Sequence, residues 1–146
     1  MQKVYSATTY FIIGYTIIVA TATVLSMLGF LPSTLRSSIG MVVAAIVFVD
    51  LSYRFFRKST PTNETVKTKS VFKIMAYWAF LSILLDVLLM VIILPLSATG
   101  SMSLAFFSTQ SSLYWMQFPM IFVFGLVGQA IYNKVVVITT ANIDLN

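Results

Sequence analysis

The carboxyl group of Asp86 is the side chain of this chain with the clearest capacity for chemistry. It interrupts an apolar run, Leu84-Leu85-Asp86-Val87-Leu88, near the middle of a long apolar stretch. A carboxylate at the centre of a bilayer costs at least about 2.5–3.5 kcal/mol, so we expect Asp86 to face the protein interior and to be neutral or paired. Such an acid can carry a proton or a cation, or it can join helices through hydrogen bonds. The sequence leaves both interpretations open, because no second acid lies at the same depth.

Three polar side chains inside the apolar stretches are candidates for intramembrane hydrogen bonds. Ser82 precedes Asp86 by four residues and therefore shares its helix face. Gln117 and Gln129 lie in the last apolar stretch. Gln129, on a neighbouring helix face, is a candidate hydrogen-bond partner for Asp86, because a polar group left unpaired in a membrane is costly.

A second acid, Asp50, precedes Arg54 by four residues. A pair at this spacing meets on one helix face, and we predict an interfacial ion pair. The alternative is an ion or proton site at Asp50.

Histidine and cysteine are both absent from the sequence. Their absence excludes histidine-ligated haem, thiolate metal sites, disulfides, and nucleophiles of the Ser-His or cysteine type. We expect no metal, no cofactor and no enzymatic activity.

Four long apolar stretches must position these groups. They cover residues 10–31, 37–56, 71–94 and 113–133 of the 146-residue chain, which is 59% hydrophobic and only 9% charged. A helix needs roughly 20 apolar residues to cross a hydrocarbon core of about 30 Å. The sequence therefore predicts an all-α membrane protein, a single domain over residues 1–146 with four transmembrane helices and short loops in the lipid bilayer.

The positive charge is concentrated on one side of these spans. Of nine Lys and Arg residues, six lie around the connection between spans two and three: Arg54, Arg57, Lys58, Lys67, Lys69 and Lys73. With four spans, both termini share a side with this connection, and only Arg36 lies opposite. By the positive-inside rule, we predict that both termini and the loop 57–70 are cytoplasmic. The net charge of +5 is then a topology signal, compatible with anionic lipid head groups, and not a signal for nucleic acid.

Small residues recur at helical spacing on three of the spans. The first span carries a seam spaced by four and three residues, and the second and fourth spans each carry a short pair: Thr9, Ile13, Thr16, Ala20, Thr23 and Met27; Gly40 and Ala44; Gly125 and Gly128. Small and hydroxyl residues allow membrane helices to approach closely. We predict that these are helix-packing faces. The alternative for the first seam is a polar track for a substrate.

Local signals also suggest where helices begin and end. Ser37 and Ser38 are suitable N-cap residues for the second span. Thr60-Pro61 resembles a helix start that could run into the third span, and Pro95 is expected to end that span.

The segment from Ser37 to Val71 joins an apolar span to Tyr53-Arg54-Phe55-Phe56-Arg57 and then to Pro61-Thr62-Asn63-Glu64. With the four-span plan, this pattern resembles small uncharacterised inner-membrane proteins of proteobacteria. The resemblance covers about a quarter of the chain and implies a bacterial or archaeal cytoplasmic membrane but no activity.

Three functions are compatible with these features. The first is a non-enzymatic accessory or structural subunit of a larger membrane complex or of a homo-oligomer, whose partners are other transmembrane subunits or a second copy. The second is a small proton- or cation-coupled transporter or channel that uses Asp86. The third is an immunity or exclusion protein that occupies the spans of a pore-forming invader.

Overall fold

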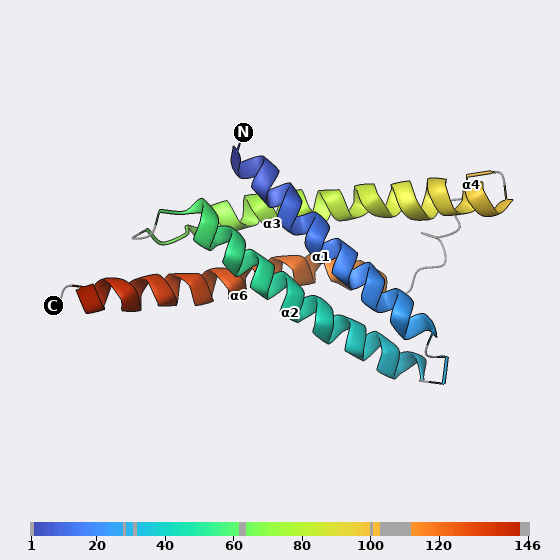
Figure 1. Ribbon diagram of the computed structural model, residues 1–146, viewed down its shortest axis with the longest axis horizontal. Coiled ribbons are helices and arrows are strands. Elements are labelled where there is room, and N and C mark those ends of the chain that lie inside the picture. Colours follow the sequence, from blue (N-terminus) through green and yellow to red (C-terminus); the bar gives the residue numbers. More distant parts are fainter. Residues whose placement is uncertain are drawn as a thin grey trace.

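The computed structural model describes residues 2–27, 29–30, 32–61, 64–99, 101–102 and 112–143. These residues are helical apart from short connections and contain no strand. The elements are α1 (Gln2–Met27), α2 (Ser33–Ser59), α3 (Thr68–Asp86), the π-helix η1 (Val87–Ile93), α4 (Leu94–Thr99) and α6 (Ser112–Ile143), as Figure 1 shows. Four segments are long and apolar enough to cross a membrane: Ser6–Met27, Ser33–Ser59, Thr68–Ser97 and Trp115–Thr140. The predicted all-α class with four spans is confirmed.

The helices extend beyond the apolar stretches, and the predicted N-cap of the second span is wrong. Helix α2 begins at Ser33, directly after Pro32. Within its first turns, the hydroxyl of Ser37 donates to the carbonyl of Ser33 at 3.0 Å and that of Ser38 to Thr34 at 2.9 Å. A serine inside a helix can satisfy its hydroxyl in this way on the preceding turn, so it need not mark the helix start.

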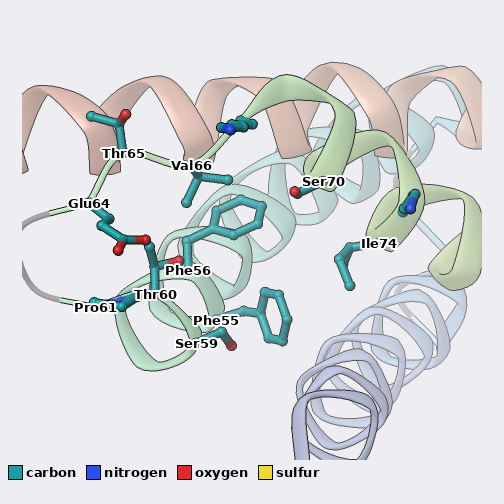
Figure 2. Close-up of a pocket in the computed structure, with 12 residues that line it drawn as sticks. Phe55, Phe56, Ser59, Thr60, Pro61, Glu64, Thr65, Val66, Ser70 and Ile74 are labelled. Carbon is teal, nitrogen blue, oxygen red and sulfur yellow. The ribbon is translucent and has the colours of Figure 1, made fainter.

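The predicted helix start at Pro61 is also wrong. Helix α2 ends at Ser59, Thr60 is extended, and α3 begins only at Thr68. The intervening connection is held by α6: the Asn133 side chain accepts from the Val66 amide at 2.8 Å and donates to the Val66 carbonyl at 3.1 Å. These bonds pair the backbone amide and carbonyl of Val66, so this connection does not need to form a helix to satisfy them. Figure 2 shows this connection descending from Val66 and Thr65 to Glu64.

Pro95 does not end the third span, contrary to prediction. The chain passes from α3 through the seven-residue π-helix η1 into α4, which contains Pro95. Proline in an α-helix clashes with the carbonyl four residues earlier and leaves it without a donor. The wider π turn changes the pairing just before Pro95, which is a recognised way for membrane helices to accommodate proline.

The four spans form a closed ring in which α2 and α3 each pack against both α1 and α6. Figure 1 shows α1 and α2 as an antiparallel hairpin that crosses the pair made by α3 and α6. The hydrogen-bonded pairs of α1 and α3, Ala7 with Trp78 and Tyr15 with Asp86, keep a constant separation of 71 residues. These two helices therefore run in the same direction, as the first and third spans of such a chain must.

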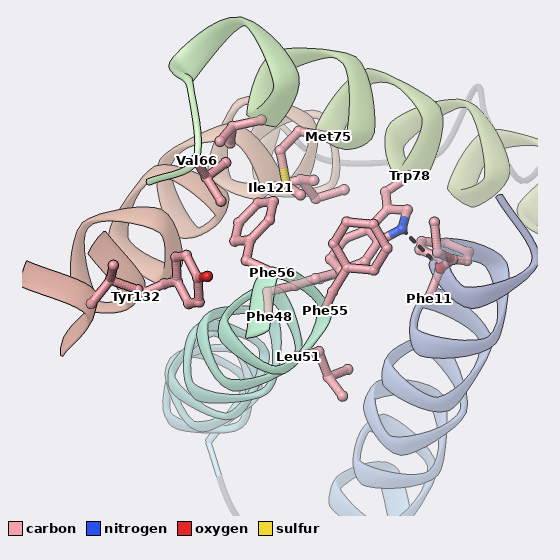
Figure 3. Close-up of a cluster of buried hydrophobic side chains, with 13 residues drawn as sticks. Phe11, Phe48, Leu51, Phe55, Phe56, Val66, Met75, Trp78, Ile121 and Tyr132 are labelled. Carbon is pink, nitrogen blue, oxygen red and sulfur yellow. Dashed lines mark hydrogen bonds between the residues drawn. The ribbon is translucent and has the colours of Figure 1, made fainter. Parts of the chain in front are cut away.

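Trp78 is the centre of the core. Its side chain is fully buried, and its ring lies 6.1–6.3 Å from the rings of Phe11, Phe48 and Phe55. Figure 3 shows these aromatic groups converging from three helices. The core occupies the half of the bundle that holds the α2–α3 connection, since no described residue between 15 and 47 is buried. Within α1 and α2, the described residues are therefore buried only towards the end that holds the α2–α3 connection.

Candidate functional site

Asp86 lies on the inward face of α3 and binds Tyr15. It is 7% exposed, and the Tyr15 hydroxyl donates to its Oδ1 at 2.7 Å. The predicted pairing with Gln129 is wrong. The Gln129 amide lies at the level of Thr68, 3.4 Å from the Thr68 hydroxyl, and Asp86 is 18 residues further along the third span, about 27 Å at 1.5 Å per residue.

The core determines that the acid points inward. The buried positions of α3 share one helix face, at spacings of four, three, four and four residues: Val71, Met75, Trp78, Ser82 and Asp86. Asp86 therefore continues the face that packs around Trp78. Tyr15 follows the fully buried Phe11 by one turn of α1 and so meets the acid from the facing helix.

Three cross-helix hydrogen bonds join α1 to α3. The indole Nε1 of Trp78 donates to the Ala7 carbonyl at 3.0 Å, the hydroxyls of Thr8 and Tyr77 lie 2.8 Å apart, and Tyr15 donates to Asp86. Of the three, the Tyr15–Asp86 bond lies furthest from the packed end of the bundle.

The backbone changes form immediately after Asp86. The amide of Val87 is shared between the carbonyls of Ile83 and Leu84, and the π-helix η1 begins at Val87. Such π segments occur frequently at functional sites, but they also accommodate proline, as here at Pro95. Chemically, the arrangement contains a carboxyl group that accepts a hydrogen bond from a phenol. No cluster of three acids suitable for a metal occurs among the described residues.

Asp50 and Arg54 lie at the surface of α2. The guanidinium Nε is 2.8 Å from the Asp50 carboxylate, and the two side chains are 63% and 48% exposed for Arg54 and Asp50 respectively. An exposed ion pair one helical turn apart is screened and contributes little to stability. Its geometry is that of a local pair at the end of a span.

The glutamines of α6 take roles that the sequence did not predict. Gln129 is buried, and its Nε2 donates to the Val66 carbonyl at 2.6 Å, beside the bonds from Asn133. Tyr132 also reaches this connection, and its hydroxyl donates to the Glu64 carbonyl at 3.3 Å. The signal available in the sequence was the spacing of Gln129 and Asn133, four residues apart in an apolar stretch. The Gln117 amide nitrogen is enclosed and has no hydrogen-bond partner within the described part of the chain.

Glycines provide the closest helix approaches. A Cβ atom at Gly128 would lie 2.7 Å from the Ser52 Cβ and 3.0 Å from the Val49 carbonyl oxygen of α2. A Cβ at Gly125 would overlap the Met75 side chain of α3. Gly40 is looser: its Cβ would lie 3.9 Å from Leu25, and the nearby Ala44 is half-buried.

The seam predicted on the first span does not pack against the described part of the chain. All six of its side chains are exposed: Thr9, Ile13, Thr16, Ala20, Thr23 and Met27. Helix α1 packs instead through the opposite face, which carries Ala7, Phe11 and Gly14. Between the described helices of one chain this face is therefore not used, because the large aromatic side chains of the core pack against the opposite face of α1. A contact with another chain stays a prediction.

No family model, no curated protein and no solved structure matches this chain. The resemblance to small four-span proteins of the proteobacterial inner membrane therefore stays a prediction.

Proposed function

We propose that this chain is a non-enzymatic integral membrane protein that acts as a structural subunit, in a homo-oligomer or a larger membrane complex. The observation that carries the proposal is the outward position of the α1 seam formed by Thr9, Ile13, Thr16, Ala20, Thr23 and Met27. Lipid chains accept large apolar groups readily, whereas a row of small and hydroxyl residues is typical of a helix contact.

Helix α1 is the span least buried by the rest of the chain, which supports this proposal. Only 11% of its span is buried inside the chain, compared with 19–33% of the other three spans. The core leaves α1 attached by one face, so the opposite face is available to another helix. The lack of histidine and cysteine in the sequence supports a role without catalysis.

Enlarging the seam is expected to break the assembly without unfolding the chain. In a Thr16→Leu/Ala20→Leu variant, two exposed small residues become bulky and keep a partner helix at a distance. We expect the particle mass in detergent, measured by light scattering, to fall to that of a single chain or to lose its associated subunits. The melting temperature should change little, because neither residue contacts the core.

A Val42→Leu/Ile46→Leu variant is the matched control. Both side chains are exposed, at 59% and 64%, but they lie on α2 and not on the seam of α1. This control should keep the mass of the wild-type particle. If the seam variant keeps that mass as well, the seam is not an interface and the proposal fails.

We also propose that both termini and the α2–α3 connection lie in the cytoplasm, because the basic residues concentrate there. The chain has no cysteine of its own, so single cysteines report orientation cleanly. In intact cells, Thr65→Cys should be protected from an impermeant thiol reagent, whereas Ser33→Cys, exposed at the opposite end of α2, should react. The reverse labelling pattern would invert the proposed orientation.

A coupled transporter is the second candidate, favoured by one observation. Asp86 is a buried acid inside a span, bonded to a phenol and followed by a π-helix. Intramembrane acids commonly carry protons or ions. The structural proposal is preferred because the Tyr15 hydroxyl donates to the carboxyl from the facing helix, in the manner of a helix–helix bond.

A further inference from the structure

A pocket opens where α2, the α2–α3 connection and α3 meet. Its volume is about 350 Å³. Its lining is divided by chemistry, with apolar side chains on one part and hydroxyl or charged groups on the other: Phe55, Phe56, Val66 and Ile74; Ser59, Thr60, Thr65, Ser70, Glu64, Lys67 and Lys73. Figure 2 shows Phe55 and Phe56 of α2 facing Val66 and Ile74 across this space, with Ser59 and Ser70 at its margins.

The pocket lies at the level where the spans meet water. Helix α2 ends at Ser59 and α3 begins at Thr68, so the hydroxyl groups belong to the ends of two membrane spans. A ligand there would meet the head-group region of the bilayer with one end and hydrocarbon with the other. An apolar wall beside a polar margin matches an amphipathic molecule and not a free ion.

The charge around the pocket favours an anion. Lys67 and Lys73 line it, and Arg57, Lys58 and Lys69 are exposed on the adjoining turns. Glu64 is the one acid among the lining residues. Two cations facing one acid leave a net positive pocket within a strongly basic surface, which attracts anionic lipids.

We propose that this pocket binds the head group of an anionic phospholipid that carries hydroxyl groups, of the phosphatidylglycerol class. Lys67 and Lys73 neutralise the phosphate, and the lining serine and threonine hydroxyls donate to its oxygens. The Glu64 carboxylate accepts from a head-group hydroxyl, which explains an acid in a cationic pocket. The aromatic and aliphatic wall receives the start of an acyl chain.

The test uses the purified full chain in detergent, titrated with phosphatidylglycerol and followed by native mass spectrometry. A Lys67→Gln/Lys73→Gln variant is compared with Lys58→Gln/Lys69→Gln, which removes the same charge from the same surface but does not line the pocket. We expect the first variant to bind about 30-fold more weakly, because it removes the two cations that line the pocket and pair with the phosphate. The second variant should bind almost as the wild type does.

Ser70→Phe provides an independent check, since it fills the pocket and keeps every charge. Ser70 is exposed, so the fold should persist, and lipid binding should be lost. Equal weakening by the two lysine variants would show diffuse surface attraction and overturn the proposal. Equal binding of phosphatidylcholine, or displacement of the lipid by excess inorganic phosphate, would also overturn it.

Discussion

Replacing Gly128 by leucine is expected to separate α2 from α6 and to destabilise the bundle more than any exposed change. Even the first carbon of a side chain would lie 2.7 Å from the Ser52 Cβ, 3.0 Å from the Val49 oxygen and 3.2 Å from the Tyr53 nitrogen. Backbone atoms cannot move aside without moving the helix. Overpacking costs about 1–3 kcal/mol for small insertions, and we expect Gly128→Ala in that range and Gly128→Leu beyond it.

Gly40→Ala is the matched control, because its new Cβ would lie in ordinary contact, 3.9 Å from Leu25. Alanine is favoured over glycine in a helix by about 0.5–1 kcal/mol, so the control should melt at the same or a higher temperature. Thermal unfolding in detergent is the measurement. Equal melting temperatures for Gly128→Leu and the wild type would mean that α2 and α6 do not approach as described.

Gly125→Ala is expected to fall between these two variants. Its new Cβ meets the Met75 side chain, not backbone, and methionine adapts to irregular space more readily than a helix backbone does. The order Gly40, Gly125, Gly128 therefore ranks the three sites by how easily the neighbouring atoms can move.

Substitutions of Asp86 are expected to decide between a structural and a transporting role. If the carboxyl only accepts from Tyr15, Asp86→Asn keeps an acceptor of nearly the same shape, and the variant should assemble and function almost normally. Asp86→Leu leaves the Tyr15 hydroxyl without this acceptor, a loss of about 1–3 kcal/mol. If the acid carries protons or cations, Asp86→Asn should assemble yet be inactive, because the change of charge is itself the mechanism.

Tyr15→Phe completes a double-mutant cycle with Asp86→Leu. Under the structural role, the two changes should be non-additive in melting experiments, with a coupling of about 0.6–1.7 kcal/mol as for other intramembrane hydrogen bonds. Additive effects would show that the bond contributes nothing to assembly. An assembled but inactive Asp86→Asn protein, judged by a cellular phenotype, would overturn the structural role in favour of transport.

The four spans and the all-α class could be predicted from the sequence because apolar length is a local property. A helix that satisfies its own backbone is the available solution for a long apolar segment in lipid, whatever its neighbours are. The spacing of four between Asp50 and Arg54 was sufficient for the same reason, since both residues lie on one helix and their distance depends on that helix alone.

Helix ends were less predictable, because contacts from other helices and turns compete with the local sequence signals. Pro61 carried a helix-start signal, yet Gln129 and Asn133 of another helix bond the backbone of Val66, which lies after Pro61 in the α2–α3 connection. Pro95 carried a helix-end signal, yet a π-helix upstream accommodates it.

Only the tertiary structure decided which face of α1 packs against the core and which residue bonds Asp86. Lipid chains are as apolar as a protein interior, so hydropathy does not distinguish a core-facing side from a lipid-facing side of a membrane helix. The small residues around Thr16 suggested one contact face, but the aromatic cluster at Trp78 recruits Phe11 on the other. That choice brings Tyr15 to Asp86, because α1 and α3 run in the same direction and this pair has the same separation of 71 residues as the bonded pair Ala7 and Trp78. The sequence by itself determined which segments cross the membrane, and only their packing determined which side chains meet inside it.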